Sequence, residues 1–264
     1  METGMKELIE KNEVAALLAY KDINGTIYPH AFTKEDISTI APWKVSDARY
    51  PILKMLLAVT RANPGKRYGI LLRGCEERGL RELVKWEQID PDMVVVIGQA
   101  CSKELAIKCV CAKPYPDALR YGEAVEGVKQ NKALTELREK DRGVRLSWWL
   151  SQFNRCLKCY GCRDVCPVCF CTDCSLEHKN LLVQGILPPD TSFHLVRAVH
   201  MAGRCIDCGL CEETCPARIP LRSLYKEVNE IVNDVFSYET GSLDTKSPFS
   251  MIGDEALLPF QANP

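Results

Sequence analysis

The sequence predicts an α/β domain with a short parallel βαβ sheet, followed by a mainly α-helical domain that is rich in cysteine. Three observations favour this division. Two short apolar runs typical of buried strands flank an amphipathic helix in the first half of the chain. Strand patterns of this kind end at Lys113. Seven of the 15 cysteines then fall within 19 residues of the second half, between segments with helical patterns.

The composition limits the class of protein. The chain has 264 residues, of which 46% are hydrophobic and 26% charged, as in ordinary soluble globular proteins of one or two domains. A formal net charge of −1 indicates neither a basic surface for nucleic acid nor an acidic tail. The apolar run at residues 14–20 is too short for a transmembrane segment, and the N-terminus is too charged for a secretion signal. We therefore expect a cytoplasmic protein.

The elements of the first domain follow from local patterns. Residues 13–20 and 26–32 predict two strands around the Asn-Gly turn at 24–25, and Thr33 predicts the start of a short helix. The next predicted elements are a helix, a buried strand, an amphipathic helix and a second buried strand, over residues 49–62, 67–75, 76–88 and 92–101. Strand, helix and strand in this order favour a parallel βαβ unit.

The second half has helical patterns. Residues 114–122 read as a loop because prolines interrupt them. Helices are predicted over residues 125–155, 192–203 and 219–236. The C-terminal residues are punctuated by Gly, Ser and Pro, which indicates an extended tail. We therefore predict a first domain, a second domain and a tail over residues 1–135, 136–236 and 237–264.

Two cysteine runs share one spacing. Cys-x2-Cys-x2-Cys-x3-Cys-Pro occurs from Cys156 to Pro167 and again from Cys205 to Pro216. In two-cluster ferredoxins the first three cysteines of such a run bind one 4Fe-4S cluster, and the fourth binds the other cluster. The spacing thus predicts two 4Fe-4S clusters. The predicted ligands are Cys156, Cys159, Cys162 and Cys215 for the first cluster, and Cys205, Cys208, Cys211 and Cys166 for the second.

Zinc and disulfides fit these runs less well. Zinc commonly takes two Cys-x2-Cys pairs, and a disulfide framework needs an oxidising compartment and usually an even number of cysteines. Between Cys166 and Cys205 lie 38 residues, more than in a compact small ferredoxin. With flanking helices, this region resembles the α-helical ferredoxin module of heterodisulfide reductase and succinate dehydrogenase iron–sulfur subunits.

Four upstream cysteines form a weaker pattern. Cys75 and Cys101 each follow a predicted parallel strand, and ligands often sit beyond the carboxyl ends of such strands. Cys109 and Cys111 lie a short helix further on and would complete four ligands. Alternatively, Cys75 and Cys101 are small buried hydrophobic residues. The spacing alone leaves both interpretations open.

The segments DARYPILKMLLAV, RYGILLRGC, VVVIGQAC and CVC resemble the beta-subunit family of deazaflavin-reducing hydrogenases and formate dehydrogenases. The resemblance is greatest to members encoded with heterodisulfide reductase-like proteins, and it covers roughly residues 10–235. It implies a third 4Fe-4S cluster, with Cys75, Cys101, Cys109 and Cys111 as ligands. The family's cysteine pair is usually Cys-x2-Cys, whereas this chain has Cys-x-Cys.

The resemblance also raises the question of a flavin. Reductase members bind FAD partly through glycine-containing segments near the cysteine pair, where this chain has AKPYPDALRYG. No G-x-G-x-x-G motif occurs in the chain. We therefore do not favour bound FAD.

The resemblance implies a non-catalytic iron–sulfur subunit that relays electrons between two partners. One is a formate dehydrogenase or hydrogenase subunit, and the other a heterodisulfide reductase-like flavoprotein. The alternative is an FAD-containing oxidoreductase that itself converts a deazaflavin or nicotinamide coenzyme. Cys169, Cys171 and Cys174 are surplus to the two ferredoxin motifs. We expect them to be structural thiols, or one of them to replace Cys109 or Cys111, rather than to hold a fourth cluster.

Overall fold

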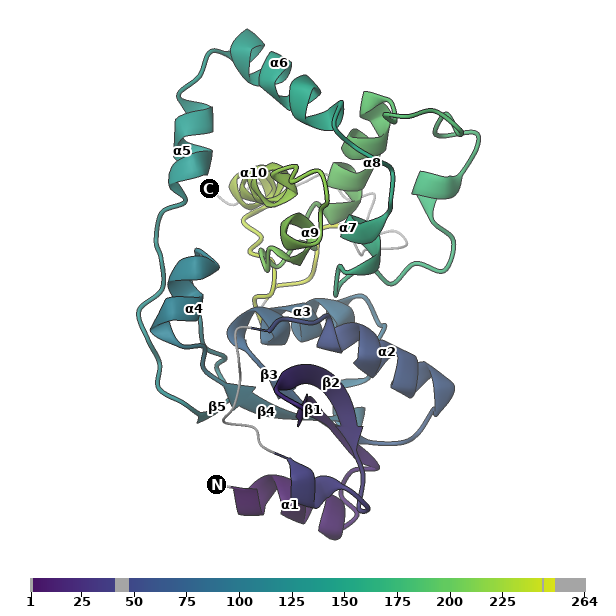
Figure 1. Cartoon of the computed structure of the whole chain (residues 1–264), viewed down its shortest axis with the longest axis vertical. Coiled ribbons are helices and arrows are strands. Elements are labelled where there is room, and N and C mark those ends of the chain that lie inside the picture. Colours follow the sequence, from purple (N-terminus) through teal and green to yellow (C-terminus); the bar gives the residue numbers. More distant parts are fainter. Residues whose placement is uncertain (1, 41–47, 244, 250–264) are drawn as a thin grey trace.

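The structure, a computed structural model, describes residues 2–40, 48–243 and 245–249. A β-sheet lies toward one end of the molecule and the cysteine-rich helices toward the other (Figure 1). The sheet of the described residues has five strands in the order β2-β1-β3-β4-β5. They are Ala16–Ile23 (β1), Thr26–Phe32 (β2), Tyr68–Leu72 (β3), Val94–Gln99 (β4) and Leu119–Tyr121 (β5).

The predicted βαβ unit is confirmed. Strands β3 and β4 pair in parallel, and helix α3 (Gly74–Lys85) connects them through the chain. Strands β1 and β2 form the predicted antiparallel hairpin around the turn at residues 24–25. Strand β1 also pairs in parallel with β3, and β4 pairs in parallel with β5. Four of the five strands therefore run in the same direction.

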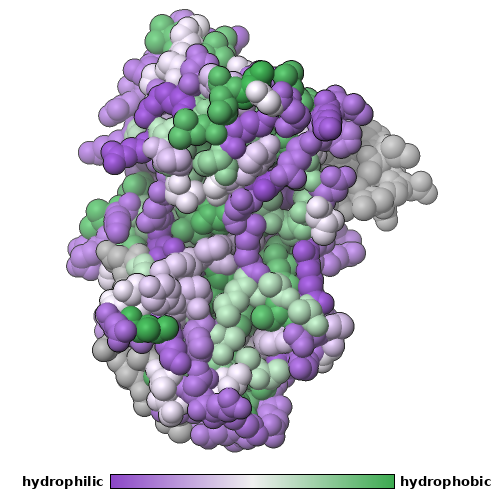
Figure 2. Space-filling view, turned by 45° about the vertical axis from the view of Figure 1, so that its right-hand side comes forward, coloured by the Kyte–Doolittle hydropathy of each residue, from purple (hydrophilic) through white to green (hydrophobic). Residues whose placement is uncertain are grey.

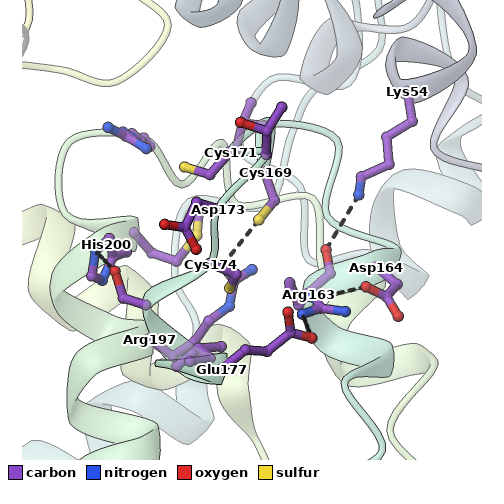
Figure 3. A pocket seen from close by; sticks show the side chains of 16 residues that line it. Lys54, Arg163, Asp164, Cys169, Cys171, Asp173, Cys174, Glu177, Arg197 and His200 are labelled. Carbon is purple, nitrogen blue, oxygen red and sulfur yellow. Dashed lines mark hydrogen bonds and ion pairs between the residues drawn. The ribbon is translucent and has the colours of Figure 1, made fainter. Parts of the chain in front are cut away.

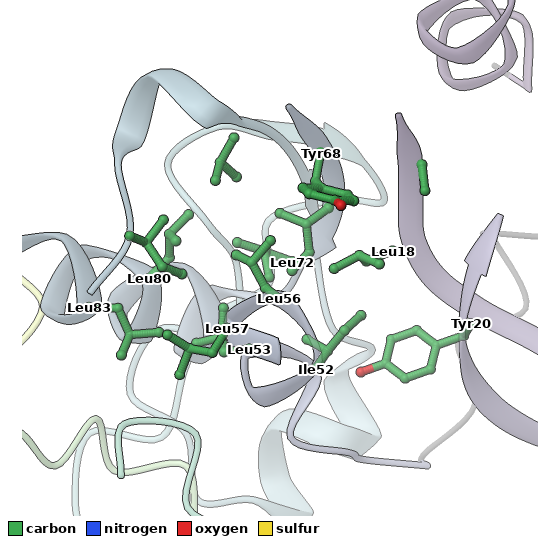
Figure 4. Close-up of a cluster of buried hydrophobic side chains, with 14 residues drawn as sticks. Leu18, Tyr20, Ile52, Leu53, Leu56, Leu57, Tyr68, Leu72, Leu80 and Leu83 are labelled. Carbon is green, nitrogen blue, oxygen red and sulfur yellow. The ribbon is translucent and has the colours of Figure 1, made fainter. Parts of the chain in front are cut away.

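Alternate residues of the strands fill two separate hydrophobic layers. Leu18 of β1 packs in a core with residues of α2 (Ile52–Ala62) and α3, such as Leu53 and Leu83 (Figure 4). Leu17, the next residue along β1, faces the opposite layer and packs with Met5 of helix α1 (Glu2–Glu10). This period of two is the pattern expected for a sheet with both faces covered. Helices α2 and α3 thereby separate the sheet from the cysteine-rich region (Figure 1).

Two local predictions for the first domain need correction, and one helix was not predicted. Residues 114–122, predicted to be a loop, contain the short strand β5, which pairs with β4 across a register shift. Of the helix predicted from Thr33, the described residues up to Ile40 form only one 3-10 turn, η1 (Ile37–Thr39), although the Asp36 carboxylate accepts a hydrogen bond from the Thr33 amide at 2.9 Å, as at a helix start. Helix α1 has no counterpart among the predicted elements.

Helices dominate the described residues beyond β4. The predicted helices at 192–203 and 219–236 are confirmed as α8 and α10, and the segment 125–155 divides into α5 and α6. Asp141 separates these two helices by capping α6, since its carboxylate accepts from the Gly143 amide. The elements not yet given are η2 (Pro91–Met93), α4 (Lys103–Lys108), α5 (Lys132–Arg138), α6 (Arg142–Phe153), α7 (Gly161–Asp164), η3 (Ser175–Glu177), α8 (Thr191–Met201), α9 (Leu210–Glu213) and α10 (Leu221–Phe236).

The start of the predicted tail returns from α10 to helix α3. Glu82 of α3 is only 1% exposed, and its Oε1 accepts from the Tyr238 hydroxyl at 2.6 Å and the Gly241 amide at 2.7 Å. Lys85 pairs with the same carboxylate at 3.3 Å. One buried carboxylate thus links the α/β layer to the chain that follows α10. Residues 244 and 250–264 of the predicted tail lie outside the described residues.

Glu82→Ala should therefore destabilise the protein by about 3 kcal/mol, because it leaves Lys85 and two buried donors without their acceptor. The measurement is urea unfolding of the anaerobically purified protein, followed by circular dichroism. Glu136→Ala is the control, since Glu136 is an exposed residue of α5. Equal unfolding midpoints for the two variants would contradict this role of Glu82.

Candidate iron–sulfur centres

The two cysteine runs adopt the same backbone path. In the first, Lys158 and Tyr160 have left-handed φ angles of 49° and 58°. In the second, Asp207 and Gly209 occupy the equivalent places, with φ angles of 56° and 77°. Each loop then enters a single helical turn, α7 or α9, and these two turns pack against each other. Left-handed residues at alternate positions curl a loop tightly, so that several of its cysteines can surround one cluster.

The first group of thiols contains cysteines from both runs. Burial raises the pKa of the Cys162 thiol to about 11; Arg197 lowers this pKa, and the neighbouring Cys156, Cys159 and Cys215 raise it. The Lys158 amide donates a hydrogen bond to Cys156 Sγ at 3.3 Å. The structure thus brings together the four cysteines predicted for the first cluster, including Cys215 from the second run.

The second group has the reciprocal composition. Burial raises the pKa of the Cys205 thiol to about 12, and Cys166 from the first run raises it further. The pKa of Cys211 is raised by burial and then by Cys205, Cys208 and Cys166. The four cysteines predicted for the second cluster therefore also lie together. Cys162 of the first group also raises the pKa of Cys211, so the first and second groups are neighbours.

A third group gathers at the carboxyl ends of β3 and β4. Cys75 lies in the first turn of α3, and burial raises the pKa of its thiol to about 11, with Cys111 contributing to the rise. Burial raises the pKa of Cys101 to about 12, with Cys75 as the next cause. Cys109 is the C-cap residue of helix α4. Burial raises the pKa of its thiol, Arg49 lowers this pKa, and Cys111 raises it. All four upstream cysteines thus meet at one edge of the sheet.

A glycine permits this assembly. A Cβ atom on Gly74 would lie 2.6 Å from the Lys113 carbonyl oxygen and 2.5 Å from that of Tyr115. The segment just after Cys111 therefore passes directly over the start of α3, where only glycine leaves room. This close approach holds Cys111 beside Cys75.

The third group also borders the second. The pKa of Cys208 is raised well above its usual value by burial and then by Cys75. Arg49 donates a hydrogen bond to the Cys208 carbonyl at 2.6 Å, and Arg222 of α10 donates to the carbonyls of Cys109 and Val110. The three groups of thiols thus follow one another across the molecule, with the second group in the middle.

Arg197 is the main buried cation beside the first two groups. Its side chain, on α8, is 3% exposed and donates hydrogen bonds to the Cys162 carbonyl at 3.2 Å and to Cys169 Sγ at 3.6 Å. Thiolates attract such a charge, which offsets the cost of gathering anions in a buried site. No sequence pattern distinguished Arg197 or Arg222 from the other arginines, because their roles depend on tertiary contacts.

The donor chemistry of the three groups suits iron–sulfur clusters. Within residues 2–40, 48–243 and 245–249, no three Cys, His, Asp or Glu side chains converge as ligands of a single metal ion. A 4Fe-4S cluster instead binds one thiolate at each of its four irons, so the ligands surround it. Burial and neighbouring cysteines raise the pKa values of thiols such as Cys75, Cys162 and Cys205, and iron would offset both effects by replacing their protons.

Comparison with known proteins agrees with this chemistry. Residues 155–220 match the family model described as a 4Fe-4S dicluster domain. The chain contains a 4Fe-4S dicluster domain. This domain comprises both cysteine runs, and it accounts for their paired spacing and their shared backbone path.

Two relatives extend the similarity beyond the dicluster domain. The chain is 34% identical over 170 residues to the F420-dependent formate dehydrogenase subunit beta of Methanocaldococcus jannaschii, which covers 63% of this chain and 40% of the relative. It is 44% identical over 175 residues to the F420-dependent formate dehydrogenase 1 subunit beta of Methanococcus maripaludis, or 66% of this chain and 41% of the relative. The resemblance to formate dehydrogenase beta subunits is confirmed, although the chain spans only about two fifths of their length.

None of the helices in the described part of the chain has the length and apolar character needed to cross a membrane. The surplus cysteines Cys169, Cys171 and Cys174 line a cavity beside α8. Cys169 lies near Cys166 and Arg197.

Arg197→Gln should lower the midpoint potential of the dicluster domain by on the order of 50–100 mV, because a buried positive charge stabilises the reduced and more negative cluster. The measurement is a redox titration followed by electron paramagnetic resonance. The exposed Arg155 beside the first run supplies the control, and Arg155→Gln should shift the potential far less because water screens its charge. Equal shifts in the two variants would argue against this role for Arg197.

Proposed function

We propose that the chain is an iron–sulfur electron-transfer subunit of a multi-subunit oxidoreductase, with three 4Fe-4S clusters in series. The order of the three thiol groups is the observation that carries the proposal. Cys75 of the third group is close enough to Cys208 of the second to raise its pKa, and Cys162 of the first group likewise raises the pKa of Cys211 of the second. Neighbouring clusters in this order would let single electrons cross the molecule step by step.

The proposed ligands are those predicted from the spacing and the family resemblance. The first cluster takes Cys156, Cys159, Cys162 and Cys215; the second Cys205, Cys208, Cys211 and Cys166; and the third Cys75, Cys101, Cys109 and Cys111. The dicluster domain would be the mainly helical kind, within a second domain at residues 136–236. The third cluster would belong to the first domain, residues 1–135, and residues 237–264 would form the tail.

The surface at the dicluster end suits a protein partner. Cys159 of the first group is an exposed cysteine, and Leu157 beside it is 59% exposed. Leu146 and Leu150 of α6 are also exposed, and hydrophobic side chains gather on this end of the molecule (Figure 2). An exposed apolar patch beside a cluster ligand is typical of a docking surface for another redox protein.

The proposed partners follow from the relatives. Both relatives are named as beta subunits of formate dehydrogenases, so a formate dehydrogenase or hydrogenase subunit is the proposed partner on one side. A heterodisulfide reductase-like flavoprotein is the proposed partner on the other, and the assembly would be cytoplasmic. In this arrangement the chain itself is not the catalytic subunit.

The names of the relatives also favour a second candidate function. They are F420-dependent enzymes, and an FAD-containing subunit would convert a deazaflavin or a nicotinamide into single electrons. Flavin absorbance in the anaerobically purified chain, bleached by a reduced deazaflavin or nicotinamide, would decide for this candidate. Protein without flavin that still accepts electrons from a low-potential donor would decide for the relay.

The proposal predicts about twelve iron atoms per chain, four for each cluster. Cys101→Ser should reduce the iron content to about eight, because it removes a ligand of the third cluster only. Iron and protein quantitation on anaerobic samples measures both values. An iron content of about eight atoms in the wild-type chain would contradict the third cluster and would indicate that Cys75 and Cys101 are core residues.

Cys166→Ala should remove the signal of the cluster held by Cys205, Cys208 and Cys211, although Cys166 belongs to the other run. Electron paramagnetic resonance of the reduced protein identifies the lost signal by comparison with Cys159→Ala, which should remove the first cluster. Cys171→Ala should retain both clusters and serves as the control. If Cys166→Ala and Cys159→Ala lose the same signal, the exchange of ligands between the runs is wrong.

A further inference from the structure

The three surplus cysteines line a single cavity. Cys169, Cys171 and Cys174 contribute to the wall of a cavity of about 260 Å³, together with residues of α8 (Figure 3). None of the three has a place in the paired motif, which is complete at Cys166 and Cys215. Their position in one cavity of the dicluster domain, outside the paired motif, indicates a separate site.

Two of these cysteines have the spacing of a redox pair. Cys171 and Cys174 enclose Thr172 and Asp173, which makes a Cys-x-x-Cys sequence. Cysteines at this spacing can form a disulfide and often exchange electrons as a dithiol. Cys171 is exposed, whereas Cys174 is only partly so and interacts through a hydrogen bond with Arg163. The pair thus has an accessible thiol and a sheltered thiol.

The wall of the cavity also touches both groups of the dicluster domain. Arg197 donates to Cys169 Sγ on the cavity side and to the Cys162 carbonyl in the first group. Cys169 is near Cys166 of the second group, and the Cys169 amide donates to the Cys166 carbonyl. A 4Fe-4S cluster passes one electron at a time, whereas reducing a disulfide takes two. Two clusters beside one cavity can supply both electrons.

Cationic side chains give the cavity its charge. Arg163 pairs with Asp164 and Glu177, but Lys54 and Arg204 also line the cavity. The Arg204 guanidinium lies 3.5 Å from the ring centre of Trp86 and 4.9 Å from that of Phe170, which holds it in place. Arg197 is nearly fully buried, and its Nε has no hydrogen-bond partner in the described structure. With Asp173 as the remaining carboxylate, these cations favour an anionic ligand.

We propose that Cys171 and Cys174 form a redox-active disulfide–dithiol pair that the two adjacent clusters reduce, and that this pair reduces disulfides of small anionic molecules in the cavity. The proposal rests on the electron-transfer function proposed above. It assigns a role to two cysteines that the relay itself does not need.

Reducing the Cys171–Cys174 disulfide takes two electrons and two protons. The two adjacent clusters, when bound, would supply one electron each; the S–S bond breaks, and two protons from water complete the two thiols. The Cys171 thiolate then attacks one sulfur of the anionic disulfide, which releases the first small thiol and leaves a mixed disulfide. Cys174 attacks Cys171 of this intermediate, which releases the second small thiol and restores the protein disulfide. Cys171 is the attacking group because it is the exposed member of the pair.

The test uses the full chain with its clusters loaded, held anaerobically at a series of potentials. Free thiols are trapped with iodoacetamide and located by peptide mass. We expect Cys171 and Cys174 to change together, with the tenfold interval of about 30 mV that a two-electron couple requires. Free thiols at both positions at every potential would overturn the proposal, as would a bound metal ion that Cys171→Ser and Cys174→Ser both release.

A second measurement examines the ligand. With Cys174→Ser, oxidised glutathione should form a lasting mixed disulfide with Cys171, because the resolving thiol is absent. Adding Arg204→Gln to this variant should slow that reaction about five-fold, but it should leave the reaction with the neutral 2-hydroxyethyl disulfide unchanged. Equal effects on the two disulfides would overturn the assignment of an anionic ligand.

The two proposals fail in different ways. Absence of cluster signals in the wild-type protein would contradict the proposed electron-transfer function, whereas the thiol titration tests only the Cys171–Cys174 pair. The expected result is that Cys171→Ser keeps all cluster signals and loses the two-electron couple. Cys169→Ser is the matched control, and it should keep both.

Discussion

The cost of burying several thiolates together is the constraint on which this structure depends. Burial raises the pKa values of Cys75, Cys101, Cys162 and Cys205, and their neighbouring thiols raise them further. As thiolates, the form that binds iron, such groups need positive charge close by, from iron and from arginines. Arg197 is the nearest example for the dicluster domain, because it is buried and contacts the first group directly.

The same constraint explains how the two halves of the molecule are joined. Arg49 comes from the segment before α2 and contacts Cys208 and Glu213, while Arg222 of α10 reaches back to Cys109 and Val110. Each arginine thus brings its charge to the place where the second and third thiol groups meet. Glu82, further along α3, adds an attachment through Tyr238 and Gly241. The contacts that hold the halves together are therefore also those that fix the distance between thiol groups.

Much of the fold followed from local patterns. Strands β1 to β4 and helices α2, α3, α8 and α10 were all predictable, because each carries its own hydrophobic period or cap. Strand β5 was missed because its three residues have little strand character, and pairing with β4 alone defines it. The helix predicted from Thr33 is only a 3-10 turn, although the Asp36 carboxylate accepts from the Thr33 amide as at a helix start, so a local capping contact did not decide the length of this element.

The sequence by itself determined the chemistry of the site. The repeated cysteine spacing is typical of 4Fe-4S ligation, because the chain between successive ligands must wrap one cubane. Only the tertiary structure decided that Cys75 lies beside Cys208 and that Arg197 lies against Cys162. It also decided that Cys171 and Cys174 share a cavity. Spacing along the chain controls local loops, whereas contacts between loops depend on how the helices that carry them pack.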